Sequence, residues 1–87
     1  MKEDQELSFV LEKALGRCRA ALPTVEITAE SSLTRDLGLD SLQALELISE
    51  IESDVGVSIP AEMLPQAVSL KDLAVMIVQL RAESRGE

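Results

Sequence analysis

The sequence contains no histidine, tryptophan or tyrosine, and Phe9 is its only aromatic residue. Histidine is the usual general base near neutral pH and the commonest metal ligand. Aromatic rings are the usual platforms on which proteins stack nucleobases. The composition therefore argues against a stand-alone enzyme, against a histidine metal site and against binding of single-stranded nucleic acid.

Cysteine and long hydrophobic runs are also scarce. The single cysteine, Cys18, cannot form an intrachain disulfide, and the longest uninterrupted apolar run covers only residues 73–78. A membrane span requires roughly 18 apolar residues. The acidic start, MKEDQEL, lacks the basic region and the apolar run of a secretory signal peptide. We expect a cytoplasmic protein without a membrane span.

Positive charge is scarce as well. The 87 residues carry 8 Lys and Arg against 16 Asp and Glu, a net charge of −8. Such a chain repels nucleic acid and anionic lipid and favours a partner with a basic surface. No Lys or Arg lies between Arg35 and Lys71, a segment that contains seven acids. They are Asp36, Asp40, Glu46, Glu50, Glu52, Asp54 and Glu62.

The length predicts one domain over residues 1–87, with a core over about 4–80 and a frayed tail at 81–87. We expect this domain to be a monomer.

Apolar residues recur every three or four positions in three stretches, which predicts three amphipathic helices. The first covers residues 4–22, the second runs from Asp40 to about Val55, and the third begins at Ser69. Residues 61–67 follow Pro60 and contain Pro65, so they have room for little more than one helical turn. The predicted fold class is all-α, an up-down bundle of four helices, three longer and one short, with a long first loop. Isolated apolar residues of this loop are expected to contact the core. They are Ile27, Leu33, Leu37 and Leu39.

Helix-end signals support these boundaries. Asp40 can cap the second helix, and Gln43, three residues later, can complete a capping box. Gly56 suits the left-handed residue that ends a helix. Ser69, with Asp72 three residues later, predicts the start of the last helix.

The second helix has apolar residues on two sides. At about 100° per residue, one arc faces the core and comprises Ala44, Leu47, Ile48, Ile51 and Val55. The opposite side, here called the docking face, comprises Leu42, Leu45, Glu46, Ser49, Glu52 and Ser53. Leucines rimmed by carboxylates favour a basic, partly apolar partner. The alternative is a solvated acidic face, because single exposed leucines are ordinary.

Ser41 is the first residue after the predicted cap. Unpaired backbone N–H groups and the positive end of the helix dipole would stabilise a phosphate attached there. Ser41 lacks a histidine to activate it and a G-x-S-x-G elbow around it, so its modification is favoured over catalysis by it. The alternative is a serine that only begins a helix.

Residues 36–42, Asp-Leu-Gly-Leu-Asp-Ser-Leu, resemble the attachment site of acyl carrier proteins, an Asp-Ser-Leu triplet after a leucine-glycine turn. The helix order, the Ile59-Pro60 step and the short third helix also resemble that family. The resemblance implies that a phosphopantetheinyl transferase moves 4′-phosphopantetheine from coenzyme A onto Ser41. The chain would then carry acyl groups as thioesters, while acyltransferases, ketosynthases or ligases supply the catalysis.

The family resemblance also implies which residues face partner enzymes. They are Asp40, Leu42, Leu45, Glu46, Ser49, Glu52 and Ile59. Gln43, Ser49 and Ser53 depart from the acidic or larger apolar residues of many fatty-acid carriers, so this surface is less charged than theirs.

Three readings of the function stay open at this point. The first is an acyl carrier for fatty-acid, polyketide or related biosynthesis. The second is an aminoacyl or peptidyl carrier, although such carriers more often show a Gly-Gly-His-Ser site than an aspartate before the serine. The third is a cofactor-free helical interaction domain that uses Leu42 and Leu45.

Overall fold

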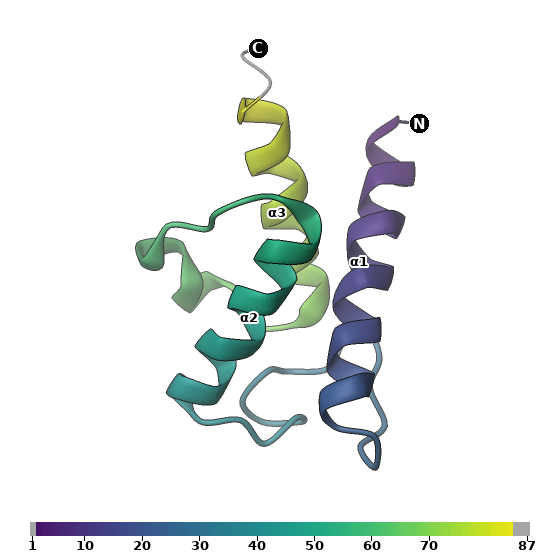
Figure 1. The fold of residues 1–87 in the computed structure, drawn as a ribbon, viewed down its shortest axis with the longest axis vertical. Helices are drawn as coiled ribbons and strands as arrows, with labels where there is room; N and C mark the ends of the chain where they lie inside the picture. The colour runs from purple at the N-terminus through teal and green to yellow at the C-terminus, as the bar shows by residue number, and fades with distance from the viewer. Residues whose placement is uncertain (1, 85–87) are drawn as a thin grey trace.

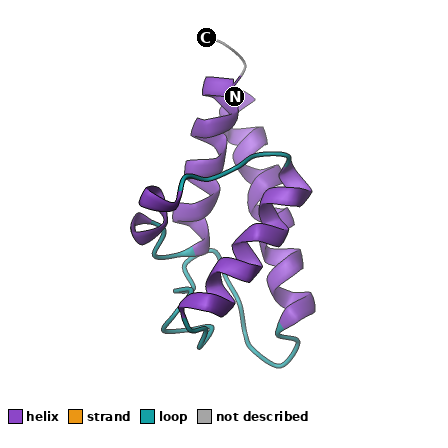
Figure 2. Ribbon diagram, turned by 60° about the vertical axis from the view of Figure 1, so that its left-hand side comes forward, coloured by secondary structure: helices purple, strands orange, loops and turns teal. Residues whose placement is uncertain are grey.

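The computed structural model describes residues 2–84 of the chain. Its elements are α1 (Lys2–Ala21), α2 (Ser41–Val55), the short 3₁₀ helix η1 (Ala61–Gln66) and α3 (Leu70–Ser84). Helix α1 runs antiparallel to α2 and α3, and the long loop closes one end of the bundle (Figure 1). The described residues form helices and loops (Figure 2), apart from one isolated bridge between Ser32 and Ser69. The predicted all-α bundle with a long first loop is confirmed.

Helix α1 packs on both other long helices through a stripe with a spacing of four residues. Val10, Ala14 and Cys18 on this stripe are fully buried. Ala21, the last residue of α1, is exposed, because the helix ends there and the chain turns away. Phe9 lies outside the core, 47 % exposed, with cationic groups of α1 and α3 over its ring.

Helix α2 begins and ends as its sequence predicts. The Gln43 N–H donates to Asp40 Oδ1 (2.8 Å), and Gln43 Oε1 accepts from the Asp40 N–H (3.1 Å), so the capping box is formed. Gly56 adopts a φ of 71° and donates its N–H to the Glu52 carbonyl (2.8 Å). The buried residues of this helix are Leu47, Ile48, Ile51 and Val55, while Ala44 is half-buried.

Helix α3 begins at the predicted position. Ser69 Oγ accepts from the Asp72 N–H (3.1 Å), and Asp72 Oδ2 accepts from the Ser69 N–H (3.2 Å). Its buried residues are Leu70, Leu73, Ala74, Met76 and Ile77. Val78 and Leu80 are partly buried and pack against this core.

The end of α3 reaches into the expected tail. Residues 81–84, part of the predicted frayed tail at 81–87, are helical. Arg81 explains this extension, because its guanidinium pairs with Glu6 of α1 (2.8 Å) and donates to the Val55 carbonyl at the end of α2 (3.2 Å). Residues 85–87 lie outside the described residues.

The long loop is held against the start of α3. Three backbone hydrogen bonds join the two segments: Leu33 N–H to Val68 O (3.0 Å), Leu70 N–H to Ser31 O (3.2 Å) and Lys71 N–H to Ala29 O (2.9 Å). The predicted anchors Ile27, Leu33 and Leu37 are buried, and Leu39 packs on the core while half-buried. Because this loop leads directly into α2, these contacts also fix where α2 begins.

Candidate functional site

The residues before α2 form a turn that hydrogen bonds and core packing hold in place. Asp36 Oδ2 accepts from the Ser32 N–H (2.7 Å), and the Asp36 N–H donates back to the Ser32 carbonyl (3.1 Å). Leu37 is only 4 % exposed and anchors this turn in the core. Gly38 has a φ of 68°, in the left-handed region that favours glycine. The turn therefore places Asp40 at its capping position in a fixed orientation.

Ser41 lies exposed on the surface as the first residue of α2. The Asp40 side chain accepts from Gln43, and the Asp40 carbonyl accepts from the Ala44 N–H (2.9 Å). The N–H groups of Ser41 and Leu42 therefore have no acceptor within the helix. The first turn of α2 contains no acidic side chain. A negative group attached at Ser41 would therefore meet the positive end of the helix dipole.

The described residues supply no base for Ser41. None of their side chains hydrogen-bonds to Ser41 Oγ. Within the same residues, no three metal-ligating side chains gather into a possible ion site.

The docking face is exposed where the helical period places it, except at Glu52. Leu42 is 64 % exposed and Leu45 is 46 % exposed, and Glu46 and Ser49 are also exposed. Asp40 is exposed beside Ser41 and uses its carboxylate for the helix cap. These five residues are therefore all accessible at and after the start of α2.

Ile59 and Glu52 differ from the expectation of freely available partner residues. Ile59 is 7 % exposed and belongs to the hydrophobic core, and its assignment as a partner-binding side chain stays a prediction. Glu52 is half-buried, and its Oε2 accepts a hydrogen bond from the Ile59 backbone N–H. The helical period could not show this contact, because it joins α2 to a loop seven residues later. Glu52 therefore holds the loop after α2.

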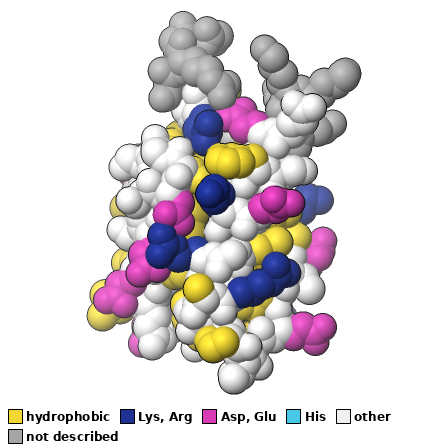
Figure 3. Space-filling view, turned by 45° about the vertical axis from the view of Figure 1, so that its right-hand side comes forward, with side chains coloured by type: hydrophobic (Ala, Val, Ile, Leu, Met, Phe, Trp, Pro, Cys, Tyr) yellow, Lys and Arg dark blue, Asp and Glu magenta, His cyan; other side chains and the backbone are white. Residues whose placement is uncertain are grey.

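Part of the negative charge of α2 is neutralised on its α1 side. The Arg17 guanidinium binds Asp54 through two hydrogen bonds (2.6 and 2.9 Å) and lies 3.9 Å from Glu50. The hydrogen bond from Arg17 lowers the pKa of Asp54, and the same bond raises the pKa of Arg17. On the side where α1 lies, Lys and Arg side chains are mixed with acidic and apolar ones (Figure 3). The negative charge of α2 that no described cation neutralises therefore lies on the side of Glu46.

Comparison with known proteins decides the family. Residues 6–77 match the family described as "Phosphopantetheine attachment site". The chain belongs to the acyl carrier protein family. A probable acyl carrier protein of Caulobacter vibrioides is 35 % identical over 80 residues, which cover 92 % of this chain and 86 % of that protein. The acyl carrier protein of Streptomyces coelicolor is 30 % identical over 84 residues, 97 % of this chain and 91 % of that protein.

Membership of the acyl carrier protein family settles three expectations. Acyl carrier proteins are carriers and not catalysts, so the chain is not an enzyme. Their cofactor is phosphopantetheine, so the reading as a cofactor-free interaction domain is excluded. Their cycle involves a phosphopantetheinyl transferase and biosynthetic enzymes as partners. Across residues 2–84, this acyl carrier protein has no helix that is both long and apolar enough to cross a membrane.

Proposed function

We propose that Ser41 is the phosphopantetheine attachment residue of a carrier of acyl thioesters in fatty-acid, polyketide or related biosynthesis. The observation that carries this proposal is the position of Ser41: an exposed hydroxyl at the first residue of α2, directly after the capping Asp40. The matched family region, residues 6–77, includes this serine. The shared core of the described helices supports a single carrier domain.

The structure around Ser41 fits a phosphate ester. The free N–H groups of the first helical turn and the helix dipole stabilise a negative group there. The turn at Gly38 and the Asp40 cap hold this helix end in place, while the serine side chain stays open to solvent. A transferase can therefore reach Ser41 Oγ without unfolding the bundle.

The carrying thiol belongs to the cofactor. When bound, phosphopantetheine supplies a thiol that holds acyl groups as thioesters. The chain's own thiol is unsuited to this role, because Cys18 is fully buried and burial raises its pKa to about 11. A buried, unpaired thiol accords with the cytoplasm as the place of action. We propose that the carrier works there as a monomer.

The proposed partners bind at the docking face. Acyltransferases, ketosynthases or ligases with basic surfaces would contact Leu42, Leu45 and Glu46, beside the tethered cargo. The relatives are acyl carrier proteins, which favours acyl over aminoacyl cargo, as does Asp40 before Ser41. Leu42→Ala and Glu46→Lys should slow transfer from such partners and change stability by less than about 0.5 kcal/mol. Unchanged transfer kinetics with several partners would contradict this surface.

A labelling experiment tests the proposed attachment residue. Purified protein is incubated with a promiscuous phosphopantetheinyl transferase and a fluorescent coenzyme A analogue, and the label is followed on a gel. We expect wild type to be labelled and Ser41→Ala to stay unlabelled with an unchanged far-UV circular dichroism spectrum. Ser8→Ala, which changes an exposed serine of α1 outside the docking face, is the matched control and should be labelled like wild type. Label on folded Ser41→Ala would overturn the proposal.

A further inference from the structure

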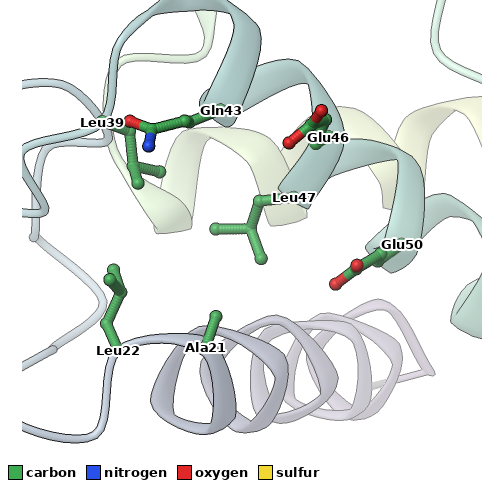
Figure 4. Close-up of a pocket in the computed structure, with 7 residues that line it drawn as sticks. All are labelled: Ala21, Leu22, Leu39, Gln43, Glu46, Leu47 and Glu50. Carbon is green, nitrogen blue, oxygen red and sulfur yellow. The ribbon is translucent and has the colours of Figure 1, made fainter.

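A pocket lies between the end of α1 and the first half of α2. Its cavity volume is about 210 Å³. Leu47 points from α2 toward Ala21 and Leu22 on the opposite side, and Leu39 points into the same space from the loop (Figure 4). Leu22 and Leu39 are only half-buried. Three leucines from three segments thus form an apolar pocket that opens to solvent next to the candidate attachment site.

Carboxylates line the α2 side of this pocket. Glu46 and Glu50, one helical turn apart, are both exposed and belong to its lining. Glu46 has no hydrogen bond or ion pair within residues 2–84. Glu50 lies 3.9 Å from Arg17, whose closer contacts, at 2.6 and 2.9 Å, go to Asp54. Glu46 therefore remains available to a cation from another molecule, and Glu50, which Arg17 approaches only at 3.9 Å, adds a second negative charge beside the pocket.

We infer that this pocket receives one apolar side chain of a partner protein, flanked by a Lys or Arg that pairs with Glu46 and Glu50. An apolar cavity of about 150 Å³ is large enough to hold benzene. A cavity of about 210 Å³ therefore has room for one side chain of the size of leucine, methionine or phenylalanine. Charge complementarity selects a basic neighbour for that side chain.

The pocket extends the docking surface around α2. On the helix, Glu46 lies between the docking-face leucines, Leu42 and Leu45, and the α1 side, where Leu47 enters the pocket. A partner that contacts both the docking-face leucines and the pocket therefore spans Glu46, which lies between these two apolar sites. This inference rests on the proposed function only in taking the partner to be an enzyme of the carrier cycle. It adds the end of α1 to the surface that such an enzyme recognises.

Peptide binding to the unmodified protein tests the inference. The probe is a helical peptide of about 16 residues, long enough to be helical, that presents one leucine between two lysines. Binding is followed in two-dimensional amide NMR spectra. We expect shifts at Ala21, Leu22, Leu39 and Gln43, and weaker binding of peptides with the leucine changed to alanine or the lysines to glutamate.

A pocket-filling substitution supplies the decisive variant. Ala21→Leu places a larger side chain in the pocket and should weaken binding at least about fivefold, the loss that marks an interface contributor. Ala20→Leu is the matched control, because Ala20 is exposed on the same helix and lines a different groove. It should bind the peptide like wild type. Far-UV circular dichroism confirms that both variants fold.

Three results would overturn the inference. The first is equal affinity of Ala21→Leu and wild type. The second is peptide-induced shifts confined to Leu42 and Leu45. The third is movement of the pocket signals only after acylation of the loaded carrier, which would make cargo the occupant. Because the peptide assay uses protein without the cofactor, failure to label Ser41 leaves its result unchanged.

Discussion

Substitution of Glu52 tests the structure sharply, because two possible roles of its carboxylate predict different effects of the same substitutions. As a docking residue, Glu52 would act through its charge. In the structure it acts through an acceptor oxygen that binds the Ile59 N–H and fastens the loop after α2. Glu52→Gln removes the charge and keeps an acceptor, whereas Glu52→Ala removes both.

The magnitude follows from the environment of the bond. Hydrogen bonds to charged groups contribute about 1.5–3 kcal/mol. The Glu52 contact is only part-buried, so we place the loss for Glu52→Ala in the range of about 1–2 kcal/mol. In a domain of this size, each kcal/mol lowers Tm by about 4–8 °C. Glu52→Gln should lose less than half as much as Glu52→Ala, because its amide oxygen still accepts from Ile59.

Thermal unfolding followed by far-UV circular dichroism measures these differences. Glu46→Ala and Glu46→Gln are the matched controls, because Glu46 lies on the same helix, is exposed and has no hydrogen bond within residues 2–84. They should change Tm little. If Glu52→Ala and Glu46→Ala unfold at the same temperature, the loop-holding role of Glu52 is refuted.

Three further predictions concern the helix cap, pH and the buried thiol. Asp40→Ala should lower the unfolding free energy in urea by about 1 kcal/mol, because the α2 cap is lost; Asp40→Asn keeps an acceptor and should lose less. Asp54 has a folded pKa below its ordinary 3.8 because Arg17 binds it, so its stabilisation is present near neutral pH and disappears as pH falls below that value. Asp54→Asn should therefore be less stable than wild type near neutral pH and equally stable in acid, and a constant difference across pH would contradict this. Cys18, with a pKa of about 11, is only about one part in a thousand thiolate near pH 8, so iodoacetamide should modify it only when urea unfolds the protein; rapid modification of the folded protein would contradict its burial.

The helices and their ends could be predicted because their causes are local in sequence. The Asp40–Gln43 capping box and the Ser69–Asp72 pair each join residues three apart, and both are present. Gly56 ends α2 because a left-handed conformation costs glycine little. The helical period likewise placed Leu42 and Leu45 on the outside correctly.

Contacts between segments could not be predicted in the same way. The Arg17–Asp54 pair joins residues 37 apart, and the contact of Arg81 with Val55 joins residues 26 apart. Nothing in a helical period selects such partners. The burial of Ile59 could not be predicted for a related reason: it lies in a loop, where no period indicates whether a side chain faces the core or solvent.

The most direct test of the central claim is tandem mass spectrometry of protein loaded by a phosphopantetheinyl transferase and coenzyme A. After proteolysis, the fragment ions locate the added group on one residue of the peptide that contains residues 36–42. We expect one phosphopantetheine per chain, on Ser41. Folded protein that gains no group, or that carries it on another residue, would contradict the account.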